Sequence, residues 1–382
     1  MQSNKLTRKI CFVTSTAMTV NAFLQGPIKM LAENNAVYVV TNLLVGDSVP
    51  VLKDSQKVIS IPLEREISPV KDLKALFALI RLFRKEKFDA VHSVTPKAGL
   101  LAMLAAFVAR IPLRVHTFTG QVWASKKGIK RFLLKCIDIL IAALTSHNLV
   151  DSPSQRDFLV SEKVISKSKA FVFEKGSISG VDLSKFKPDS EARLAIRKQL
   201  EIEDNKLVFL FIGRLNIDKG VLDLAQAFSQ INNEKLHMLF VGPDEQNMQA
   251  EINNLQKNNN NIHFIGYTDM PEVFMAAADV LCLPSYREGF GSVLIEAAAV
   301  GLPVIASRIY GITDAVIDHE TGLLHEPHDI NAIQSLIERI AEDEALRTKL
   351  GQQARARAIR DFSSELIAQA WVDFYQDKLG NA

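Results

Sequence analysis

The fold of this chain is decided by residues 278–310, ADVLCLPSYREGFGSVLIEAAAVGLPVIASRIY. Residues 280–283 form a short apolar run that ends at Pro284, a pattern that predicts a buried parallel strand. The helix-forming run 293–299 stops at Gly301-Leu-Pro, because glycine and proline end helices. The stretch therefore predicts a strand, a loop, a helix and a second strand, in that order.

The loop between this strand and this helix carries candidate chemistry. Gly289 and Gly291 flank Phe290 where the chain turns, so backbone N–H groups there can approach an anion without obstruction. This arrangement predicts a phosphate site. Glu288 lies just before the helix and Glu296 two turns into it, and they are too far apart to cap one helix end together. Both glutamates therefore need another explanation.

The size and composition of the chain limit its class. With 382 residues it is long enough for two domains that each bury a core. Its 48% hydrophobic and 23% charged content is ordinary for a soluble globular protein. No apolar run reaches the roughly 18 residues that span a bilayer, and the N-terminus lacks the apolar core of a signal peptide. We therefore expect a cytoplasmic protein.

The three cysteines, Cys11, Cys136 and Cys282, lie far apart in apolar surroundings. Their number is odd and their spacing fits no metal site, so we expect buried, reduced thiols.

The net charge of +2 hides an asymmetry between the two halves. Residues 1–190 contain 28 Lys and Arg against 15 Asp and Glu, a net charge of +13, whereas residues 191–382 contain 17 against 28, a net charge of −11. The split predicts different partners for the two halves, with the basic half facing an anionic surface or substrate. Nucleic acid is a competing partner, but the basic half carries no recognisable nucleic-acid-binding motif, so we expect none.

Apolar strands alternate with amphipathic helices along the chain. In the first half we expect strands at 9–14, 36–41, 90–92, 114–117, 148–150 and 171–173, and helices at 22–32, 70–85, 96–109 and 128–144. In the second half we expect strands at 207–212, 237–241, 262–265 and 280–283, and helices at 191–199, 220–231, 331–342, 344–361 and 363–378. The polar segment 175–188, with two glycines and a proline, is the predicted linker. The alternation predicts two doubly wound α/β domains facing a cleft, with ligands at the carboxyl ends of the strands.

A second candidate loop follows the predicted strand 207–212. Arg214 and Lys219 lie in it, just before a predicted helix, so both cations are expected at the carboxyl edge of the sheet. Two cations beside a helix N-terminus can clamp a diphosphate. Solvated loop charges are the alternative, and the glutamates expected at the same edge favour the clamp.

These motifs together resemble the retaining nucleotide-sugar glycosyltransferases of family 4, which have the GT-B fold. The resemblance rests on Arg214 and Lys219 upstream of two glutamates with seven residues between them, Glu288 and Glu296. It covers residues 211–326 closely and includes Phe240-Val-Gly-Pro-Asp, Ile265-Gly-Tyr and His319-Glu-Thr-Gly-Leu. It implies an acceptor-binding Rossmann-like domain of residues 1–180, a donor-binding one of residues 181–362, and a helix, 363–382, that crosses back to the first.

The resemblance also implies roles for the motif residues. Arg214 and Lys219 would bind the donor diphosphate, Glu288 the hydroxyls of the sugar, and Glu296 the ribose. The chemistry agrees, since an ionised carboxylate can accept hydrogen bonds from both adjacent ribose hydroxyls. A solvated helix residue is the alternative for Glu296. The implied donor-binding residues are Gly213, Arg214, Lys219, Gly266, Tyr267, Glu288, Phe290, Gly291, Ser292 and Glu296.

Departure of a nucleoside diphosphate leaves negative charge that the enzyme must stabilise. The sequence contains no Asp-x-Asp motif, and Arg214, Lys219 and the helix ends can supply positive charge. We therefore expect no metal and no other cofactor, with the nucleotide-sugar as a co-substrate. The resemblance implies retention by same-face attack on an oxocarbenium-like centre, without a covalent nucleophile.

The first half is expected to bind the acceptor. The segment 91–99 resembles an element of relatives that act on polyprenyl-diphosphate-linked glycans, and Lys97 at a predicted helix start suits an anionic group. An exposed first-turn lysine is the alternative. Many relatives place His-Gly where this chain has Thr119-Gly, while His116 lies three residues earlier. Thr119 joins Lys97 as an acceptor-binding candidate. His116 joins Glu288, Arg214 and Lys219 as a catalytic candidate, with a structural role as its alternative.

The segment 123–144 is both basic and apolar. Its lysines and arginine accompany a strongly apolar helix, a composition that lets a helix lie on an anionic membrane surface. A core helix with a solvated basic face is the alternative. The last predicted helix has an apolar stripe at helical spacing that indicates packing.

The sequence thus predicts a GT-B glycosyltransferase at the inner face of the cytoplasmic membrane, bound peripherally. It would move a hexose from a nucleotide donor, by family habit a UDP-sugar, to a lipid-linked glycan in capsule or lipopolysaccharide synthesis. Two alternatives stay open: a nucleotide-sugar epimerase of the same fold, and a catalytically silent nucleotide-sugar-binding subunit.

Overall fold

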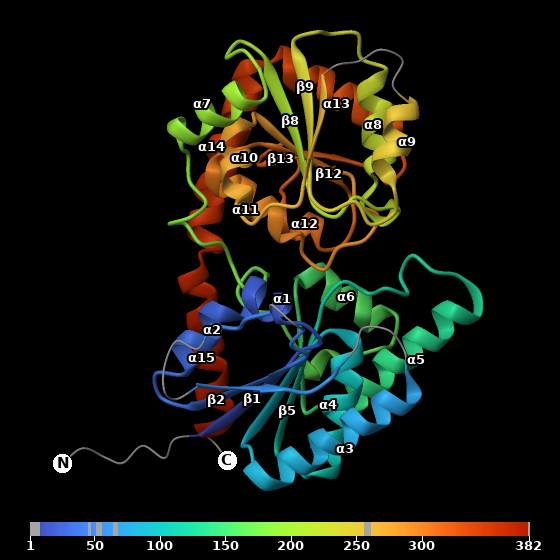
Figure 1. Ribbon diagram of the computed structural model, residues 1–382, viewed down its shortest axis with the longest axis vertical. Helices are drawn as coiled ribbons and strands as arrows, with labels where there is room; N and C mark the ends of the chain where they lie inside the picture. The colour runs from blue at the N-terminus through green and yellow to red at the C-terminus, as the bar shows by residue number, and fades with distance from the viewer. Residues whose placement is uncertain (1–7, 45–46, 51–55, 64–67, 256–260, 381–382) are drawn as a thin grey trace, which may run out of the picture. The chain divides into compact units, whose positions relative to one another are not determined.

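The computed structural model describes residues 8–44, 47–50, 56–63, 68–255 and 261–380. The chain divides into two compact units, here called the N-terminal domain (residues 1–180 with 364–382) and the C-terminal domain (181–363). Each domain is built around one parallel sheet with helices on its faces (Figure 1). The prediction of two Rossmann-like domains is therefore confirmed.

The N-terminal sheet has seven parallel strands in the order β3-β2-β1-β4-β5-β6-β7. They are β1 (Lys9–Val13), β2 (Ala36–Thr41), β3 (Gln56–Ser60), β4 (Ala90–Val94), β5 (Leu113–Phe118), β6 (His147–Val150) and β7 (Ala170–Phe171). The chain reverses its direction of progress across the sheet between β3 and β4, at the β1/β4 pair. The carboxyl ends of β1, β4 and β5 therefore lie at the switch point, where open α/β sheets bind their ligands.

Helices cover both faces of this sheet because its strands alternate apolar side chains between the two sides. Cys11 and Val13 of β1 face one apolar core, and Ile10 and Phe12 face the other. The first core lies under α3 (Pro69–Glu86), α4 (Pro96–Val108), α5 (Gly128–Leu144) and α6 (Pro153–Ser161). The second lies under a helical segment made of α1 (Ala17–Thr19), η1 (Val20–Leu24) and α2 (Gln25–Leu31), and under the C-terminal helix.

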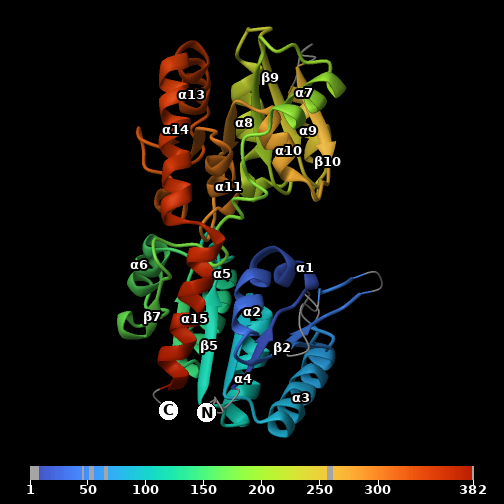
Figure 2. The same ribbon diagram turned by 90° about the vertical axis from the view of Figure 1, so that its left-hand side faces the viewer.

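The C-terminal helix α15 (Ser364–Gly380) belongs to the N-terminal domain, where it packs beside α2 (Figure 2). Trp371 is fully buried, and its Nε1 donates a hydrogen bond to the carbonyl of Ile178 at 2.9 Å. The hydroxyl of Tyr375 lies 2.8 Å from Nδ1 of His92, a buried residue of β4. The apolar stripe of this helix therefore packs in the core.

The C-terminal sheet has six parallel strands in the order β10-β9-β8-β11-β12-β13. They are β8 (Leu207–Ile212), β9 (Leu236–Val241), β10 (Ile262–Gly266), β11 (Val280–Leu283), β12 (Val304–Ser307) and β13 (Gly322–His325). Because β8 pairs with both β9 and β11, the loops that follow these three strands meet at one edge. Those loops contain the candidate donor residues.

The helices of the C-terminal domain form two layers (Figure 1). One layer contains α8 (Val221–Ser229), α9 (Met248–Leu255) and α13 (Ile330–Glu342), with α8 touching both of the others. The other contains α7 (Ser190–Gln199), α10 (Pro271–Ala277), α11 (Ser292–Val300) and α14 (Glu344–Asp361), with α11 touching α10 and α14. A short helix, α12 (Ile312–Ala315), follows β12.

Several expected elements differ from the structure. The first helical segment begins at Ala17 rather than at residue 22, because Thr16 caps it and a π-helical turn continues it into α2. The sequence prediction missed β3 and β13, and also α6, α9, α10 and α12. These are short or polar elements, and neighbouring strands and helices hold them in place.

Two composition-based expectations can be compared with the structure. Cys11 and Cys282 are buried and unbridged, as predicted, but Cys136 is partly exposed because it lies on the outward side of α5. Among the described residues, no helix combines the length and the apolar character needed to cross a bilayer.

Candidate donor and acceptor sites

Two loops carry most of the predicted donor residues and are called the first and second donor loops for that predicted role. The first connects β8 to α8 and carries Arg214 and Lys219. The guanidinium of Arg214 lies 3.1 Å from a carboxylate oxygen of Glu245, and both side chains are exposed. The neighbouring Asn216 donates a hydrogen bond from Nδ2 to the same carboxylate at 3.1 Å. Glu245 follows β9, so the pairing of β8 with β9 brings the two groups together.

Close backbone packing fixes the two ends of this loop. A Cβ atom on Gly242 would lie 2.0 Å from the carbonyl oxygen of Gly213. The turn after β9 can therefore pack against the turn after β8 only with a glycine at position 242. Gly220 has φ +66°, and a Cβ on it would lie 2.1 Å from the carbonyl oxygen of Pro284. Glycine is therefore required where α8 starts beside the end of β11.

Lys219 meets Glu288 at the carboxyl edge of the sheet. The Nζ atom of Lys219 lies 2.5 Å from Oε1 of Glu288, and the two side chains are 20% and 13% exposed. Lys219 ends a 3-10 turn (η3, Ile217–Lys219) after β8, whereas Glu288 follows the neighbouring strand β11. The structure thus places two predicted site residues, 69 positions apart in sequence, in direct contact.

The second donor loop, residues 288–291, leads directly into α11. Gly291 has φ +77° and occupies the N-cap position, so the helix start carries no capping side chain and the N–H group of Ser292 follows it immediately. Phe290 is 3% exposed, and its ring turns inward against Phe362. The loop therefore presents backbone N–H groups rather than an aromatic side chain, which suits an anion at a helix N-terminus.

Glu296 is the fifth residue of α11, about one turn from its start, and is partly buried. Its pKa is raised to about 7, mainly because burial disfavours the charged form; Lys185 offsets part of this rise, and the neighbouring Glu272 adds to it. Lys185 and Glu272 pair with each other at 3.3 Å. Near neutral pH this carboxyl group therefore exchanges between its neutral and ionised forms, so a ligand that needs the carboxylate would draw it toward ionisation.

Of the remaining predicted donor residues, Gly266 is the last residue of β10 and Tyr267 follows it directly. Gly266 has φ +73°, and its carbonyl accepts a hydrogen bond from the N–H of Gly242 at 2.7 Å. Tyr267 is 68% exposed beside it. The turn places an aromatic ring in solvent at the same edge as the two donor loops.

In the N-terminal domain, the structure places His116 inside the core. It is 1% exposed, its Nδ1 lies 2.8 Å from the hydroxyl oxygen of Ser93, and burial lowers its pKa to about 3. A Cβ atom on Gly99 would lie 2.4 Å from its ring, so α4 packs directly on the imidazole. This placement favours the structural role that the sequence left open for His116.

Lys97 and Thr119 follow neighbouring strands, β4 and β5, at the carboxyl edge of the N-terminal sheet. Lys97 lies in the first turn of α4, and its Nζ is 2.6 Å from a carboxylate oxygen of Asp72 on α3. The carbonyl of Thr119 accepts a hydrogen bond from Nε2 of Gln155 at 2.8 Å, which holds the loop backbone in place. Both residues are partly exposed.

Sequence reasoning missed two groups at the donor edge. The first is Glu245, whose signal is its position immediately after the Gly242-Pro-Asp turn that follows an apolar strand. The second is Tyr286, whose hydroxyl donates to Asp223 at 2.7 Å and whose ring centroid lies 3.9 Å from that of His328. Only the tertiary fold brings α8, the loop after β11 and the loop after β13 together at this point.

Two family models match the chain. The model of glycosyl transferases group 1 matches residues 192–357, and the model of the glycosyl transferase 4-like domain matches residues 35–174.

Relatives of known activity match most of the chain. A capsular polysaccharide biosynthesis glycosyltransferase of Staphylococcus aureus is 34% identical, with 82% of this chain and 83% of the relative covered. The UDP-Gal:alpha-D-GlcNAc-diphosphoundecaprenol alpha-1,3-galactosyltransferase of Escherichia coli is 30% identical, with 89% of each chain covered. An N,N'-diacetylbacillosaminyl-diphospho-undecaprenol alpha-1,3-N-acetylgalactosaminyltransferase of Campylobacter jejuni is 26% identical, with 82% and 84% covered.

Solved structures share the fold over nearly the whole chain. Sucrose-phosphate synthase from Thermosynechococcus elongatus superposes with a TM-score of 0.83 at 24% identity, covering 98% of this chain and 100% of that one. The Anabaena protein HepE in complex with UDP and glucose gives a TM-score of 0.82 at 19% identity, covering 97% and 100%. At these identities the likeness shows the GT-B fold. Because glycosyl transferase models match both halves and a relative 34% identical covers most of the chain, the chain belongs to the group 1 glycosyl transferases.

Proposed function

We propose that this glycosyltransferase moves a sugar from a UDP-sugar to a polyprenyl-diphosphate-linked glycan, with retention of the anomeric configuration. The contact between Lys219 and Glu288 at the start of α11 carries the proposal. It sets a cation for the diphosphate beside a carboxylate for the sugar hydroxyls, next to a helix N-terminus. The names of the Escherichia coli and Campylobacter jejuni relatives, which specify diphosphoundecaprenol acceptors, support the acceptor class.

In the proposed reaction, the bond between the anomeric carbon and the diphosphate oxygen breaks with both electrons going to the UDP oxygen. Arg214, Lys219 and the N–H groups at the start of α11 would stabilise the negative charge that develops there. The acceptor hydroxyl would attack the same face of the oxocarbenium-like carbon, and its proton would pass to the departing phosphate oxygen. These groups supply the charge stabilisation without a metal, and we propose that the enzyme needs none.

The remaining roles follow from position and charge. Glu296 would accept hydrogen bonds from the two ribose hydroxyls, and Tyr267 and Gly266 would lie near the base. Lys97 would bind an anionic group of the acceptor after exchanging its contact with Asp72. Because that ion pair is largely shielded from solvent, an incoming diphosphate that replaces Asp72 must offer a comparable negative charge at the same position.

The test is a screen of UDP- and GDP-sugars against polyprenyl-diphosphate acceptors with EDTA present. We expect UDP-dependent transfer that EDTA leaves intact and that Glu288→Ala and Arg214→Ala reduce at least 100-fold, as loss of a charged transition-state contact does. Glu234→Gln, an exposed carboxylate at the opposite edge of the sheet, is the control and should retain full activity.

Each other outcome of the screen contradicts a defined part of the proposal. Full activity in Glu288→Ala would contradict the site assignment, and complete loss of activity in EDTA would contradict the metal-free mechanism. Epimerised UDP-sugar formed without acceptor would identify the epimerase. Donor binding without turnover on any acceptor would identify the silent subunit.

We also propose that α5 docks the enzyme on an anionic lipid surface. The outward face of this helix carries large apolar side chains at helical spacing, all exposed: Ile129, Phe132, Leu133, Ile139 and Leu140. Lys127 and Lys130 are exposed at its start, while its acidic residue Asp138 is buried and accepts a hydrogen bond from Nε1 of Trp123 at 2.7 Å. The exposed face is therefore apolar and basic together, which suits anionic headgroups above acyl chains.

Vesicle sedimentation tests this docking face. We expect binding to vesicles containing phosphatidylglycerol, weaker binding at high salt, and a loss of at least about tenfold in Phe132→Ser, since an inserted aromatic ring contributes about 1.5–3 kcal/mol. Leu194→Ser removes a similarly exposed apolar side chain from α7 and should bind as the wild type does. Equal binding by the two variants would exclude α5 as the docking face.

A further inference from the structure

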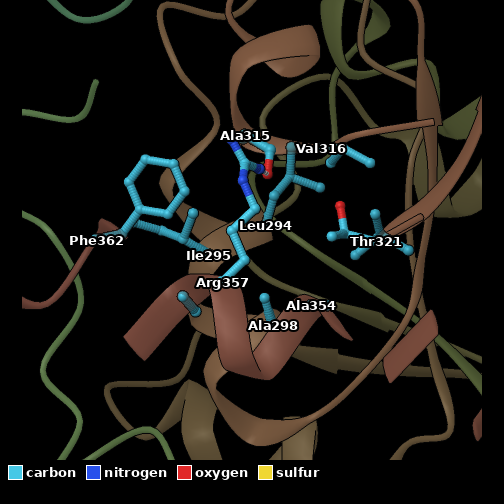
Figure 3. Close-up of a pocket in the computed structure, with 11 residues that line it drawn as sticks. Leu294, Ile295, Ala298, Ala315, Val316, Thr321, Ala354, Arg357 and Phe362 are labelled. Atoms are coloured by element: carbon cyan, nitrogen blue, oxygen red, sulfur yellow. Dashed lines mark hydrogen bonds between the residues drawn. The ribbon is translucent and has the colours of Figure 1, made fainter. Parts of the chain in front are cut away.

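Arg357, near the C-terminal end of α14, caps the C-terminal end of the short helix α12. Its side chain is 12% exposed, and its guanidinium donates hydrogen bonds to the carbonyls of Ala315 at 2.5 Å and Asp314 at 2.6 Å. Figure 3 shows the side chain reaching from α14 toward Ala315, with Phe362 to one side. One guanidinium therefore holds the last two carbonyls of α12 in a fixed position, which its planar fork suits.

The N-terminal end of α12 packs against the backbone of the second donor loop. Gly311, the N-cap of α12, has φ +84°, and a Cβ on it would lie 2.4 Å from the carbonyl oxygen of Gly289 and 3.2 Å from that of Glu288. The two backbones are thus in van der Waals contact without an intervening side chain. Because α12 has only four residues, a group that fixes its end also fixes its start, and with it the backbone of the donor loop.

A second connection runs through aromatic rings. The guanidinium carbon of Arg357 lies 4.9 Å from the ring centroid of Phe362, and that ring lies 5.3 Å from the ring of Phe290 at an interplanar angle of 61°. Phe362 and Phe290 are 1% and 3% exposed. Phe290 is the central residue of the donor loop, so Arg357 and Phe362 support the loop through both its backbone and its buried side chain.

Phe362 also marks the point where the chain enters and leaves the C-terminal domain. Its carbonyl accepts a hydrogen bond from the N–H of Val181 at 2.8 Å, and Val181 forms a parallel bridge with Ser363. The two segments that bound the domain are therefore joined to each other and to the ring that packs on Phe290.

We propose that Arg357 and Phe362 are positioning residues for the donor loop 288–291, holding its N–H groups and Glu288 in the orientation that binds the donor diphosphate and sugar. The proposal rests on the proposed function for the identity of the donor. The geometry of the loop is independent of that identity, so the two can be tested separately.

The experiment combines hydrogen exchange of the peptide 286–293 with calorimetric titration of UDP, both on the full chain. We expect Arg357→Met to accelerate exchange in this peptide and to raise the UDP dissociation constant, each about tenfold. Arg357→Lys should restore part of both effects, because an ammonium can donate to the α12 carbonyls but cannot lie flat on Phe362. Phe362→Leu should also accelerate exchange in this peptide and raise the UDP dissociation constant. Arg360→Met, on an exposed arginine of the same helix, should change neither.

The outcomes separate the two proposals. Faster exchange in Arg357→Met without any UDP binding by the wild type would overturn the donor assignment and support the positioning role. Equal exchange and equal UDP affinity in Arg357→Met and Arg360→Met would overturn the positioning role, whatever the melting temperatures. If Arg357→Met fails to fold, Arg357→Lys and Phe362→Leu decide the matter by the same two measurements.

Discussion

Replacing Glu296 by glutamine should stabilise the C-terminal domain at alkaline pH and leave it unchanged in acid. Burial raises the pKa of this carboxyl from its ordinary value of 4.5 to about 7. A folded-state pKa above the unfolded value means that the protonated form stabilises the fold below pH 4.5, and that this stability is lost as pH rises through 7. The loss above pH 7 approaches about 3 kcal/mol, at roughly 1.4 kcal/mol for each tenfold change in the protonation equilibrium.

Hydrogen exchange of α11 measures this effect locally. Both tryptophans, Trp123 and Trp371, lie in the N-terminal domain, so tryptophan fluorescence follows the other half of the molecule and should not change. At pH 8 the variant should exchange the α11 amides up to about 100-fold more slowly than the wild type, as about 3 kcal/mol implies. At pH 4.5 the two should exchange equally. Glu251→Gln, which removes the same charge from the exposed side of α9, is the matched control for Glu296→Gln. The same difference at both pH values would refute the reasoning.

The ionisation of Glu296 should also appear in donor binding. If the ribose hydroxyls require the carboxylate, only about one-tenth of the molecules are competent at pH 6, with a pKa of about 7. The affinity for a UDP-sugar, measured by calorimetry, should then fall about tenfold between pH 8 and pH 6 in the wild type. In Glu296→Gln the affinity should be weak at both pH values. A pH-dependent affinity that survives in the variant would place the titrating group elsewhere.

Two further predictions concern the loop backbones and the donor cations. Gly311→Ala should lower donor affinity at least tenfold and reduce the melting temperature, because its Cβ would overlap the carbonyl of Gly289. Gly26 has open space around it, so Gly26→Ala should be neutral or stabilising in the same thermal scan. Glu245→Gln should tighten UDP binding a few-fold in calorimetry, since it frees Arg214 from a competing carboxylate, and weaker binding would mean that Glu245 orients the guanidinium instead.

The donor half was more predictable than the acceptor half for a physical reason. In the donor loops, glycines at fixed spacing and charges soon after apolar strands leave a local signal, so the sequence predicts Lys219 and Glu288 in one site, and the structure places them in contact. His116 shows the opposite case. It lies within β5, near the carboxyl end of the strand, but whether it faces solvent depends on α4, which packs over it through Gly99, and no local pattern records that contact.

The helix α5 shows the same limit in another form. Its sequence is equally compatible with a core helix and with a surface helix, because both need an apolar face. Only the structure shows that Ile141 and Ala142 turn inward while Phe132 and Leu133 turn outward. The choice depends on which side meets the sheet, and that is a tertiary property.

In the donor site each predicted phosphate-binding cation is paired with a carboxylate, Arg214 with Glu245 and Lys219 with Glu288. The two pairs differ in exposure, and this difference assigns them different tasks. The Arg214 pair is exposed on both sides, so breaking it costs about 0–1 kcal/mol, and a diphosphate can replace Glu245 easily. The Lys219 pair is largely shielded from solvent, so a donor that binds there gains most by joining the pair, with phosphate on the lysine and sugar hydroxyls on Glu288. Under the proposed function, the first pair would therefore tune donor affinity, whereas the second would fix where the sugar–phosphate bond lies relative to the start of α11.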